Sequence, residues 1–495
     1  MKLTTVAAAL VAAGTWSVEA LQFSQRSGTE ARVVHHQIKR KLVEDPVARD
    51  RKRRLAKRQS GTLNVPLTNS ILLYYMNITV GTPEQQFEVH LDTGSSDLWL
   101  NTIDSRYCSS VQEPCFTGTY DANSSSTYSY VNSEFQIAYA DGTGSQGDYV
   151  TDTVRFSGVT LEDQQFGIGY LSSTPDGIMG IGYVRNVASA NARGSGTYSN
   201  IPQSLLDSGR ISTLAYSMWL NDLDAAEGDL LFGGVNTEKY QGELETLPIV
   251  PSSDGVHRQV TVALQGVGRN GEDSSIDSLS DLDVHLDTGA SLTYLPDDLT
   301  AKIYDAVGAQ YNRAEQVSFI DCDRADDRET LDFKFNDQKT IQVPMNELVI
   351  RYTDDICVFG ILPSGDSSFE EDSYYILGDT FLRSAYVVYD LAKNEISLAQ
   401  TVFNSTDDKI IELTNNTEVP SDPGNGGETI AATAVGASNT GSPGPTASSV
   451  LGTSANPSAT GGSGSDSESS AVSTATLSGF MIALLAGAVG GILLV

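Results

Sequence analysis

The sequence predicts an all-β fold in two halves, and three observations lead to that prediction. Short strand-like runs, separated by clusters of Gly, Asn, Asp and Ser, fill the chain between about residues 63 and 402. Helix-like stretches are few, and 203–208 and 296–311 are the clearest. The string V-H-L-D-T-G-S-S at Val89 returns as V-H-L-D-T-G-A-S at Val284, with one copy in each half.

The expected strands are short and rich in β-branched and aromatic residues. The clearest runs are 76–80, 87–91, 135–139, 230–232, 385–389 and 396–399. Two polar segments rich in turn-forming residues, 187–200 and 270–281, are predicted to be surface insertions.

The N-terminal end is predicted to be removed in two steps. Residues 1–20 are typical of a secretory signal, with Lys2 before an apolar run and V-E-A at the end; a buried N-terminal helix is the alternative. Residues 21–58 carry twelve Lys/Arg against four Asp/Glu. We interpret them as a basic pro-segment that a dibasic-specific protease cleaves after Arg58; a nucleic-acid-binding arm is the alternative.

The rest of the chain is strongly acidic. From Gln59 onward there are 18 Lys/Arg and 58 Asp/Glu, which argues against nucleic-acid binding. A basic pro-segment can dock on such a surface by charge complementarity, so we expect it to act as an intramolecular inhibitor. The chain should also be more stable in acid, where part of its self-repulsion is neutralised.

The C-terminal end is predicted to be a stalk and an anchor signal. Residues 403–476 are predicted to be a glycosylated stalk, because 418–476 are rich in Ser, Thr, Gly, Ala and Pro, a composition that cannot bury a core. Residues 477–495 form an uncharged apolar tail behind a polar spacer and small residues, which predicts GPI attachment near Gly464 and loss of the tail. A C-terminal transmembrane helix is the alternative. N-glycosylation sequons occur at Asn77, Asn123, Asn404 and Asn415.

Four cysteines suggest two disulfides in a secreted chain. Of the three possible pairings, proximity in sequence favours Cys108–Cys115 and Cys322–Cys357, one in each half. No C-x-x-C is present, so we expect no zinc or redox site, no other metal and no cofactor.

The repeated loops each present one carboxylate, Asp92 and Asp287. Two carboxylates at hydrogen-bond distance share one proton, so the pair acts as a base toward water and an acid toward a carbonyl. The following glycines, Gly94 and Gly289, allow tight turns and a close approach of the two loops. His90 and His285 repeat with the motif, and we interpret both as structural strand residues.

With these motifs the chain resembles the pepsin-like aspartic peptidases from about residue 67 to 402. D-T-G-S-S-D-L-W, ending at Trp99, resembles their first active-site loop. A-Y-A-D-G-T, with Tyr139, Asp141 and Gly142, resembles the flap over the substrate. The segments around Gly180 and Gly378, which lie 88 and 91 residues after their Asp, resemble the elements that support each loop.

The resemblance implies a bilobal double β-barrel with the active-site cleft between its lobes. The catalytic domain would span 59–402, with lobes of about 67–245 and 246–402. It also implies individual roles: Asp92 and Asp287 hold the attacking water, Thr93 and Thr288 cross-bond the loops, Ser95 bonds Asp92, and Tyr139 bonds Trp99.

Within the family the chain is most similar to fungal yapsins and candidapepsins, through residues 145–154 and 231–248. This likeness implies a monomeric, GPI-anchored endopeptidase on the extracellular face of the plasma membrane or in the cell wall, acting on polypeptides. Cleavage after basic residues and broad specificity both stay open. The alternatives are a non-catalytic cell-wall binding protein on the same fold and a carbohydrate hydrolase.

Overall fold

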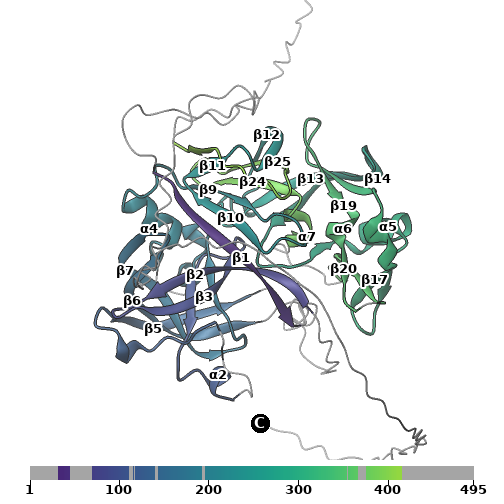
Figure 1. Ribbon diagram of the computed structural model, residues 1–495. Helices are drawn as coiled ribbons and strands as arrows, with labels where there is room; N and C mark the ends of the chain where they lie inside the picture. The colour runs from purple at the N-terminus through teal and green to yellow at the C-terminus, as the bar shows by residue number, and fades with distance from the viewer. Residues whose placement is uncertain are drawn as a thin grey trace, which may run out of the picture. The chain divides into compact units, whose positions relative to one another are not determined.

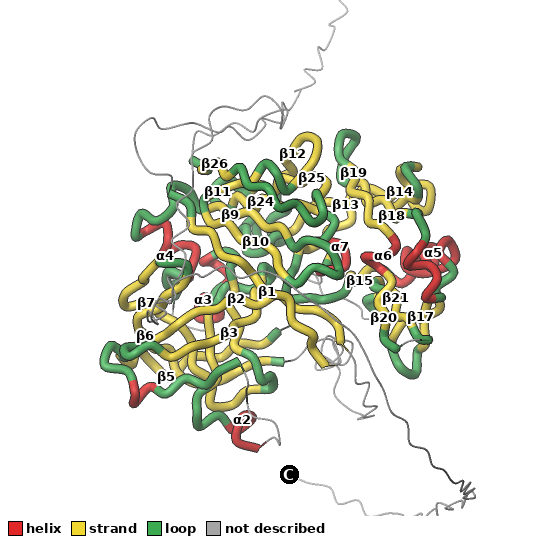
Figure 2. The backbone as a smooth tube through the Cα atoms, in the orientation of Figure 1, coloured by secondary structure: helices red, strands yellow, loops and turns green. Residues whose placement is uncertain are grey.

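Strands dominate the part of the chain that the computed structural model describes (Figures 1 and 2). That part comprises residues 32–44, 70–110, 115, 117–139, 143–191, 196–353, 355–365 and 375–414. All of it lies in one unit, Met1–Ser438, and the second unit, Asn439–Val495, is outside the described residues. The prediction of a mostly β fold is confirmed.

The largest sheet joins strands from both ends of the chain. In spatial order it contains β12 (Tyr240–Pro248), β25 (Glu395–Thr401), β24 (Ala385–Asp390), β9 (Ala215–Trp219), β10 (Glu227–Phe232), β1 (Val34–Glu44), β2 (Ser70–Val80), β3 (Gln85–Asp92), β8 (Gly177–Gly180), β4 (Leu98–Asn101), β7 (Val159–Ser172), β6 (Gly144–Phe156) and β5 (Ser129–Ala138). Burial varies along this sheet: every residue of β24 is inaccessible to solvent or nearly so, whereas β1 also has exposed residues. The complete burial of β24 explains why it is a continuous apolar run and not an alternating one.

Three smaller sheets complete the described part. One contains β19 (Thr340–Pro344), β18 (Thr330–Lys334), β13 (Thr261–Arg269), β14 (Glu272–Leu286), β23 (Tyr375–Leu377), β15 (Thr293–Leu295) and β22 (Ile361–Pro363). Another contains β16 (Gln310–Asn312), β17 (Val317–Ile320), β21 (Cys357–Phe359) and β20 (Val349–Arg351). The smallest pairs β11 (Gly234–Asn236) with β26 (Ile410–Glu412).

The helices are short and lie between strands (Figure 2). They are α2 (Arg106–Ser110), α3 (Ala188–Asn191), α4 (Ile201–Asp207), α5 (Asp297–Val307), α6 (Met345–Leu348) and α7 (Asp379–Leu382), with 3₁₀ turns η1 (Ala122–Ser124), η2 (Val184–Asn186) and η3 (Cys322–Asp326). The predicted helix over 296–311 is too long: α5 ends because Gly308 adopts a left-handed φ of 80°, and the chain then enters β16.

The segment interpreted as a pro-segment contributes an internal strand. β1 lies between β10 and β2 and is antiparallel to both (Figure 1). Its alternating residues Val34, His36 and Ile38 are buried, while Gln37 and Lys39 are exposed. This period of two makes the segment a strand of the main sheet.

The two predicted surface segments differ in burial: residues 270–281 include no buried residue, as predicted, whereas 187–200 include several. Residues 270–281 are largely part of the β13–β14 hairpin, whose tight turn uses positive φ angles at Asn270 and Gly271. Residues 187–200 include buried Val187 and Asn200, because the Asn200 side chain caps α4 and donates to the carbonyl of Gly182. Polar composition alone did not reveal these partners.

The predicted start of the stalk at residue 403 is wrong, because the folded part continues to residue 414. β26 pairs with β11, and Leu413 is buried while its N–H donates to the carbonyl of Gly233. The apolar residues of K-I-I-E-L supply the contacts that the Ser/Thr-rich sequence beyond them lacks.

Several predicted features lie outside the described residues: 1–20, Arg58, Asn415, Gly464 and 477–495. Within the described ranges, no helix is long and apolar enough to cross a membrane. The sequon residues Asn77, Asn123 and Asn404 are exposed.

The structure contains the disulfides Cys108–Cys115 and Cys322–Cys357, with Cα–Cα distances of 5.3 and 5.2 Å. The first joins α2 to the segment before β5, and the second joins η3 to β21. These are the pairings that proximity favoured.

A buried ion pair supports the second half. Arg383, which follows α7, donates from Nε to Oε2 of Glu347 in α6 at 2.5 Å, and both side chains are almost inaccessible to solvent. Arg383 also donates to the Glu347 carbonyl, and the N–H of Leu223 donates to Oε1 of Glu347. The pair therefore links both helices to a loop of the first half.

We expect Glu347→Ala to lower the free energy of unfolding by about 3–5 kcal/mol, because it leaves the Arg383 guanidinium buried without its counter-charge. Lys302→Ala, which breaks an exposed pair with Asp277, is the matched control and should cost less than about 1 kcal/mol. Urea unfolding of both variants measures the difference. Equal losses of unfolding free energy in the two variants would show that the buried ion pair contributes no more to stability than the exposed one.

Candidate active site

The two repeated loops are built on the same arrangement of strands. Asp92 is the last residue of β3, which runs parallel to β8, and β8 pairs antiparallel with β4. Asp287 directly follows β14, which runs parallel to β23, and β23 pairs antiparallel with β15. Each carboxylate thus stands where a strand ends between two neighbours.

Reciprocal hydrogen bonds join the two loops. The N–H of Thr93 donates to Oγ1 of Thr288 at 3.2 Å, and the N–H of Thr288 donates to Oγ1 of Thr93 at 3.1 Å. Each hydroxyl then donates to a carbonyl of the opposite strand, Thr93 to Leu286 at 2.8 Å and Thr288 to Leu91 at 3.0 Å. Both threonines are buried, so these four bonds fix the separation of the loops.

Each carboxylate is also held by its own loop. The N–H of Gly94 donates to Oδ1 of Asp92 at 2.8 Å, and the Ser95 hydroxyl donates to Oδ2 at 2.6 Å. In the second loop the N–H of Gly289 donates to Oδ1 of Asp287 at 2.7 Å. These donors set the plane of each carboxylate.

The loop glycines show how closely the carboxylates approach each other. A Cβ at Gly94 would lie 2.6 Å from Oδ1 of Asp287, closer than any real Cβ contact. A Cβ at Gly289 would lie 2.5 Å from Oδ1 of Asp92 and 2.9 Å from Oδ1 of Asp287. Both carboxylates therefore border the same small space.

Two further glycines let the supporting segments pack against the loops. A Cβ at Gly180 would lie 2.4 Å from the backbone nitrogen of Ser96. A Cβ at Gly378 would lie 2.3 Å from the carbonyl oxygens of both Ala290 and Leu292. Any side chain at either position would push its loop out of register.

The repeated histidines lie below the carboxylates in the strands. His90 is buried, and its Nε2 lies 3.3 Å from the carbonyl oxygen of Thr288. Burial lowers the pKa of His285 to about 3, which keeps its ring neutral over most of the pH range. Both positions agree with a structural role.

An aromatic cluster lies beside the first loop. Trp99 donates from Nε1 to the Tyr139 hydroxyl at 2.7 Å, the contact that the resemblance implies. Trp99 packs with Phe135 and Tyr149, which come from the hairpin strands β5 and β6. Asp141 and Gly142, expected at the hairpin tip, lie outside the described residues.

Sequence reasoning missed Asp97, a fully buried carboxylate two residues before Trp99. Its Oδ1 accepts hydrogen bonds from the hydroxyls of Tyr198 (2.8 Å) and Tyr149 (3.2 Å), and its Oδ2 accepts from the N–H of Ala188 (2.7 Å). Burial raises the pKa of Asp97 to about 6, against the lowering effect of these bonds. The only signal in the sequence was an acid inside an otherwise apolar D-L-W-L string.

The geometry suits the activation of one water by two carboxylates. The loops that carry the two carboxylates are cross-bonded to each other. Backbone N–H donors of each loop keep its carboxylate oriented. In the described ranges, no group of three or more His, Cys, Asp or Glu side chains is arranged to hold a metal ion.

Comparison with known proteins agrees with this geometry. Residues 73–401 match the family described as "Eukaryotic aspartyl protease". The chain is 48% identical over 402 residues to "Probable aspartic-type endopeptidase opsB" of Aspergillus oryzae, covering 78% of this chain and 80% of that protein. It is 46% identical over 423 residues to OPSB of Arthroderma benhamiae (82% and 83% covered) and 38% identical over 352 residues to candidapepsin-3 of Candida albicans (70% and 83% covered).

Asp97 predicts a loss of stability as the pH rises. Its pKa is about 6 in the folded chain against 3.8 ordinarily, so its contribution is fully present below pH 3.8 and is lost as the pH rises through about 6. The loss is roughly 3 kcal/mol, from 1.4 kcal/mol per pKa unit. Asp97→Asn should therefore flatten the dependence of the unfolding free energy on pH in this window.

Denaturant unfolding of wild type and Asp97→Asn at several pH values between 3.5 and 7 measures this effect, and the difference between the curves isolates Asp97 from other carboxyl groups. Asp337→Asn, at a side chain that is 95% exposed, serves as the control. Parallel curves for wild type and Asp97→Asn would contradict the assignment.

Proposed function

Because this chain belongs to the family of eukaryotic aspartyl proteases and is an aspartic-type endopeptidase, we propose that Asp92 and Asp287 together activate the water that hydrolyses the peptide bond. The observation that supports these roles most directly is the placement of both carboxylates around one small space by the Thr93–Thr288 cross-bonds. No other carboxylate pair among the described residues stands on matched, cross-bonded loops.

The reaction needs only the shared proton of the pair. One carboxylate takes a proton from the water as its oxygen attacks the peptide carbonyl carbon, while the other gives its proton to the carbonyl oxygen. The tetrahedral diol then collapses: one of its hydroxyls returns a proton to the carboxylate that gave one, the C–N bond breaks, and the leaving nitrogen takes the proton that the other carboxylate removed from water. Ser95, Gly94 and Gly289 keep the carboxylate planes aligned for these transfers.

We further propose that the fold is the bilobal double β-barrel of this family, with lobes of about 67–245 and 246–402 and a substrate cleft between them. The substrate would lie extended beneath the β5–β6 hairpin, which carries Tyr139 near its tip. The bond from Trp99 to Tyr139 supports this arrangement, because it positions the hairpin relative to the loop of Asp92.

The chain is also proposed to be made as a zymogen. The β1 strand, within the 21–58 pro-segment, is anchored in the main sheet by its buried side chains and by charged contacts. His35 contacts Asp229 at 2.7 Å, and Lys41 pairs with Glu88. Cleavage after Arg58 by a dibasic-specific protease would then leave β1 bound only by these contacts, as an inhibitor that must dissociate.

For the location of the enzyme, we propose secretion under the 1–20 signal and display at the cell surface through a GPI lipid attached near Gly464. Two features support this: the composition of the C-terminal end and the similarity to a protein named "Secreted aspartic protease 3". A yapsin-like role in processing surface proteins, by a monomer that carries N-linked glycans at the exposed Asn77, Asn123 and Asn404, completes the proposal.

The catalytic roles predict that Asp92→Asn and Asp287→Asn each lower kcat/KM by roughly 10²–10⁴-fold or more, because neither amide can exchange the proton. The measurement is cleavage of a diverse peptide library at acidic pH by the processed enzyme. Asp337→Asn, a change at an exposed acid, is the control. Full activity in either catalytic variant would refute the roles, and an inactive wild type would favour a non-catalytic binding protein.

The zymogen model predicts that acid releases β1. Burial lowers the pKa of His36 to about 4, and its Nε2 has no hydrogen-bond partner among the described residues. In a released strand, His36 takes up a proton below pH 6.5, whereas in the docked strand it stays neutral down to about pH 4. The affinity of β1 for the sheet therefore falls as the pH falls through this window. The raised pKa of His35 acts in the opposite direction.

After cleavage at Arg58, we expect wild type to retain β1 at pH 7 and to lose it progressively between pH 6.5 and 4, by roughly 10²-fold in affinity. His36→Gln should show a much weaker pH dependence, and His35→Gln is the companion variant. Size-exclusion chromatography with mass spectrometry of the bound fragment measures retention. An unchanged pH dependence in His36→Gln would show that other groups control release.

A further inference from the structure

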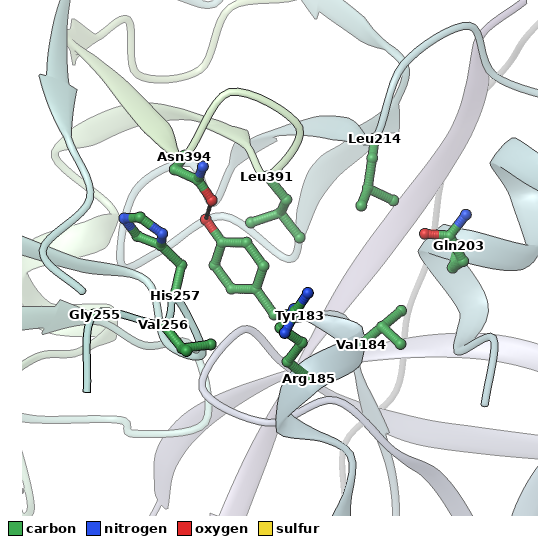
Figure 3. Close-up of a pocket in the computed structure, with 10 residues that line it drawn as sticks. All are labelled: Tyr183, Val184, Arg185, Gln203, Leu214, Gly255, Val256, His257, Leu391 and Asn394. Carbon is green, nitrogen blue, oxygen red and sulfur yellow. Dashed lines mark hydrogen bonds between the residues drawn. The ribbon is translucent and has the colours of Figure 1, made fainter. Parts of the chain in front are cut away.

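A cavity of about 470 Å³ lies among several segments of the described chain (Figure 3). Its walls come from parts of the chain that are far apart in sequence: residues 183–185, Gln203 of α4, Leu214, residues 255–257, and the β24–β25 turn. The volume falls in the range of sites that accept a small ligand or an amino-acid side chain. None of its lining residues is an Asp or Glu.

The cavity is close to the catalytic loops because its walls continue from them. The N–H of Gly182 donates to the Ser95 carbonyl at 2.8 Å, and the Asn186 side chain lies 3.5 Å from the Gly94 carbonyl oxygen. Tyr183 and Arg185 lie between these two contacts along the chain. The cavity is therefore within reach of a polypeptide bound across the carboxylates.

Two basic side chains line the cavity. Arg185 is exposed and forms no ion pair with a described residue. His257 lies near Asn394, as Figure 3 shows, and its Nε2 bonds the Ile249 carbonyl at 3.1 Å. That bond fixes the Nε2–H, which leaves Nδ1 available to a ligand.

Three acids adjoin lining residues, and two of them are paired with cations; the third, Asp207, accepts a hydrogen bond from Nε2 of the lining Gln203 at 2.7 Å. Asp254 forms a two-bond pair with Arg258, and Asp390 lies 3.5 Å from Lys393. They therefore compete little for a positive charge at the cavity wall. In a chain this acidic, a concave site with a permanent cation and no acid in its lining is selective for anions.

The remaining lining adds apolar and hydrogen-bonding contacts. Leu214, Leu391 and Val184 provide apolar surface for a methylene stem. Tyr183 is buried, and its hydroxyl donates to the Asn394 side chain at 3.1 Å, which holds one wall in place (Figure 3). An acid on a short apolar stem fits this combination better than a bare inorganic anion.

We propose that this cavity is a specificity subsite that binds a glutamate side chain of the polypeptide substrate through Arg185 and His257. The proposal rests on the endopeptidase activity and on a substrate bound across Asp92 and Asp287. An extended chain advances about 3.3 Å per residue, so only one position of the substrate can place its side chain in the cavity at a time. The subsite thus selects an acidic residue at one position of the substrate.

The test is a peptide series with one cleavable bond, in which Glu or Gln occupies each position in turn on both sides. Every peptide is made with a free and with an amidated C-terminus, to separate a side-chain carboxylate from a chain-end carboxylate. The processed wild-type enzyme is compared with Arg185→Gln and His257→Gln. Arg313→Gln, at an exposed arginine in the β16–β17 turn, is the matched control.

We expect wild type to prefer Glu over Gln by roughly tenfold in kcat/KM at one position, as one charge-assisted contact would give. The ratio of kcat/KM for the Glu peptide to that for the Gln peptide should fall toward one in Arg185→Gln and remain unchanged in Arg313→Gln. No preference at any position, a preference that Arg185→Gln keeps, or one seen only with a free C-terminus would overturn the proposal. If the enzyme cleaves the Gln peptides and Asp92→Asn abolishes that cleavage, the catalytic roles stand even where the subsite proposal fails.

Discussion

The exchange of hydrogen bonds between Thr93 and Thr288 is the interaction on which the rest of the structure depends. It joins loops that are 195 residues apart in sequence, and all four donors and acceptors are buried. Loss of one partner would leave buried polar groups unsatisfied, which costs far more than the bond itself contributes. The carboxylates are consequently held together despite their mutual repulsion.

Other features support this junction from both halves. Glycines at positions 180 and 378 let β8 and β23 lie directly against the loops, where no Cβ would fit. On the first side, Asp97 connects the loop to Tyr149 of β6, to Ala188 and to Tyr198. On the second side, Arg383 and Glu347 connect α7, next to Gly378, to α6.

The same contacts that place the site also link it to pH and to processing. The folded chain is more stable when Asp97 is protonated, so acid stabilises the segment that carries Asp97 and Trp99. The docked form of β1 is more stable when His36 is neutral, so acid weakens the binding of β1 to the sheet. One change in pH therefore stabilises the fold around Asp97 and weakens the docking of β1, through two buried groups of opposite charge type.

The repeated motif by itself predicts much of the candidate site, because each copy of the string supplies one carboxylate with the same flanking threonine and glycine. Asp92, Asp287 and their glycines and threonines follow from eight consecutive letters. The strands were predictable for a similar reason: apolar runs between turn residues are a local pattern. Cys108 and Cys115 are seven residues apart, so their pairing was also local.

Tertiary structure alone decided the features that depend on distant partners. β1 pairs with β10 nearly two hundred residues later, and β26 returns to β11, so neither segment shows in its own letters that it belongs to a sheet. Asp97 looks like a surface acid until Tyr149 and Tyr198 close over it. The cavity at Arg185 exists only where several separate segments meet. Sequence determines local pattern and chemistry, whereas burial and proximity arise from long-range packing, which no short window of residues encodes.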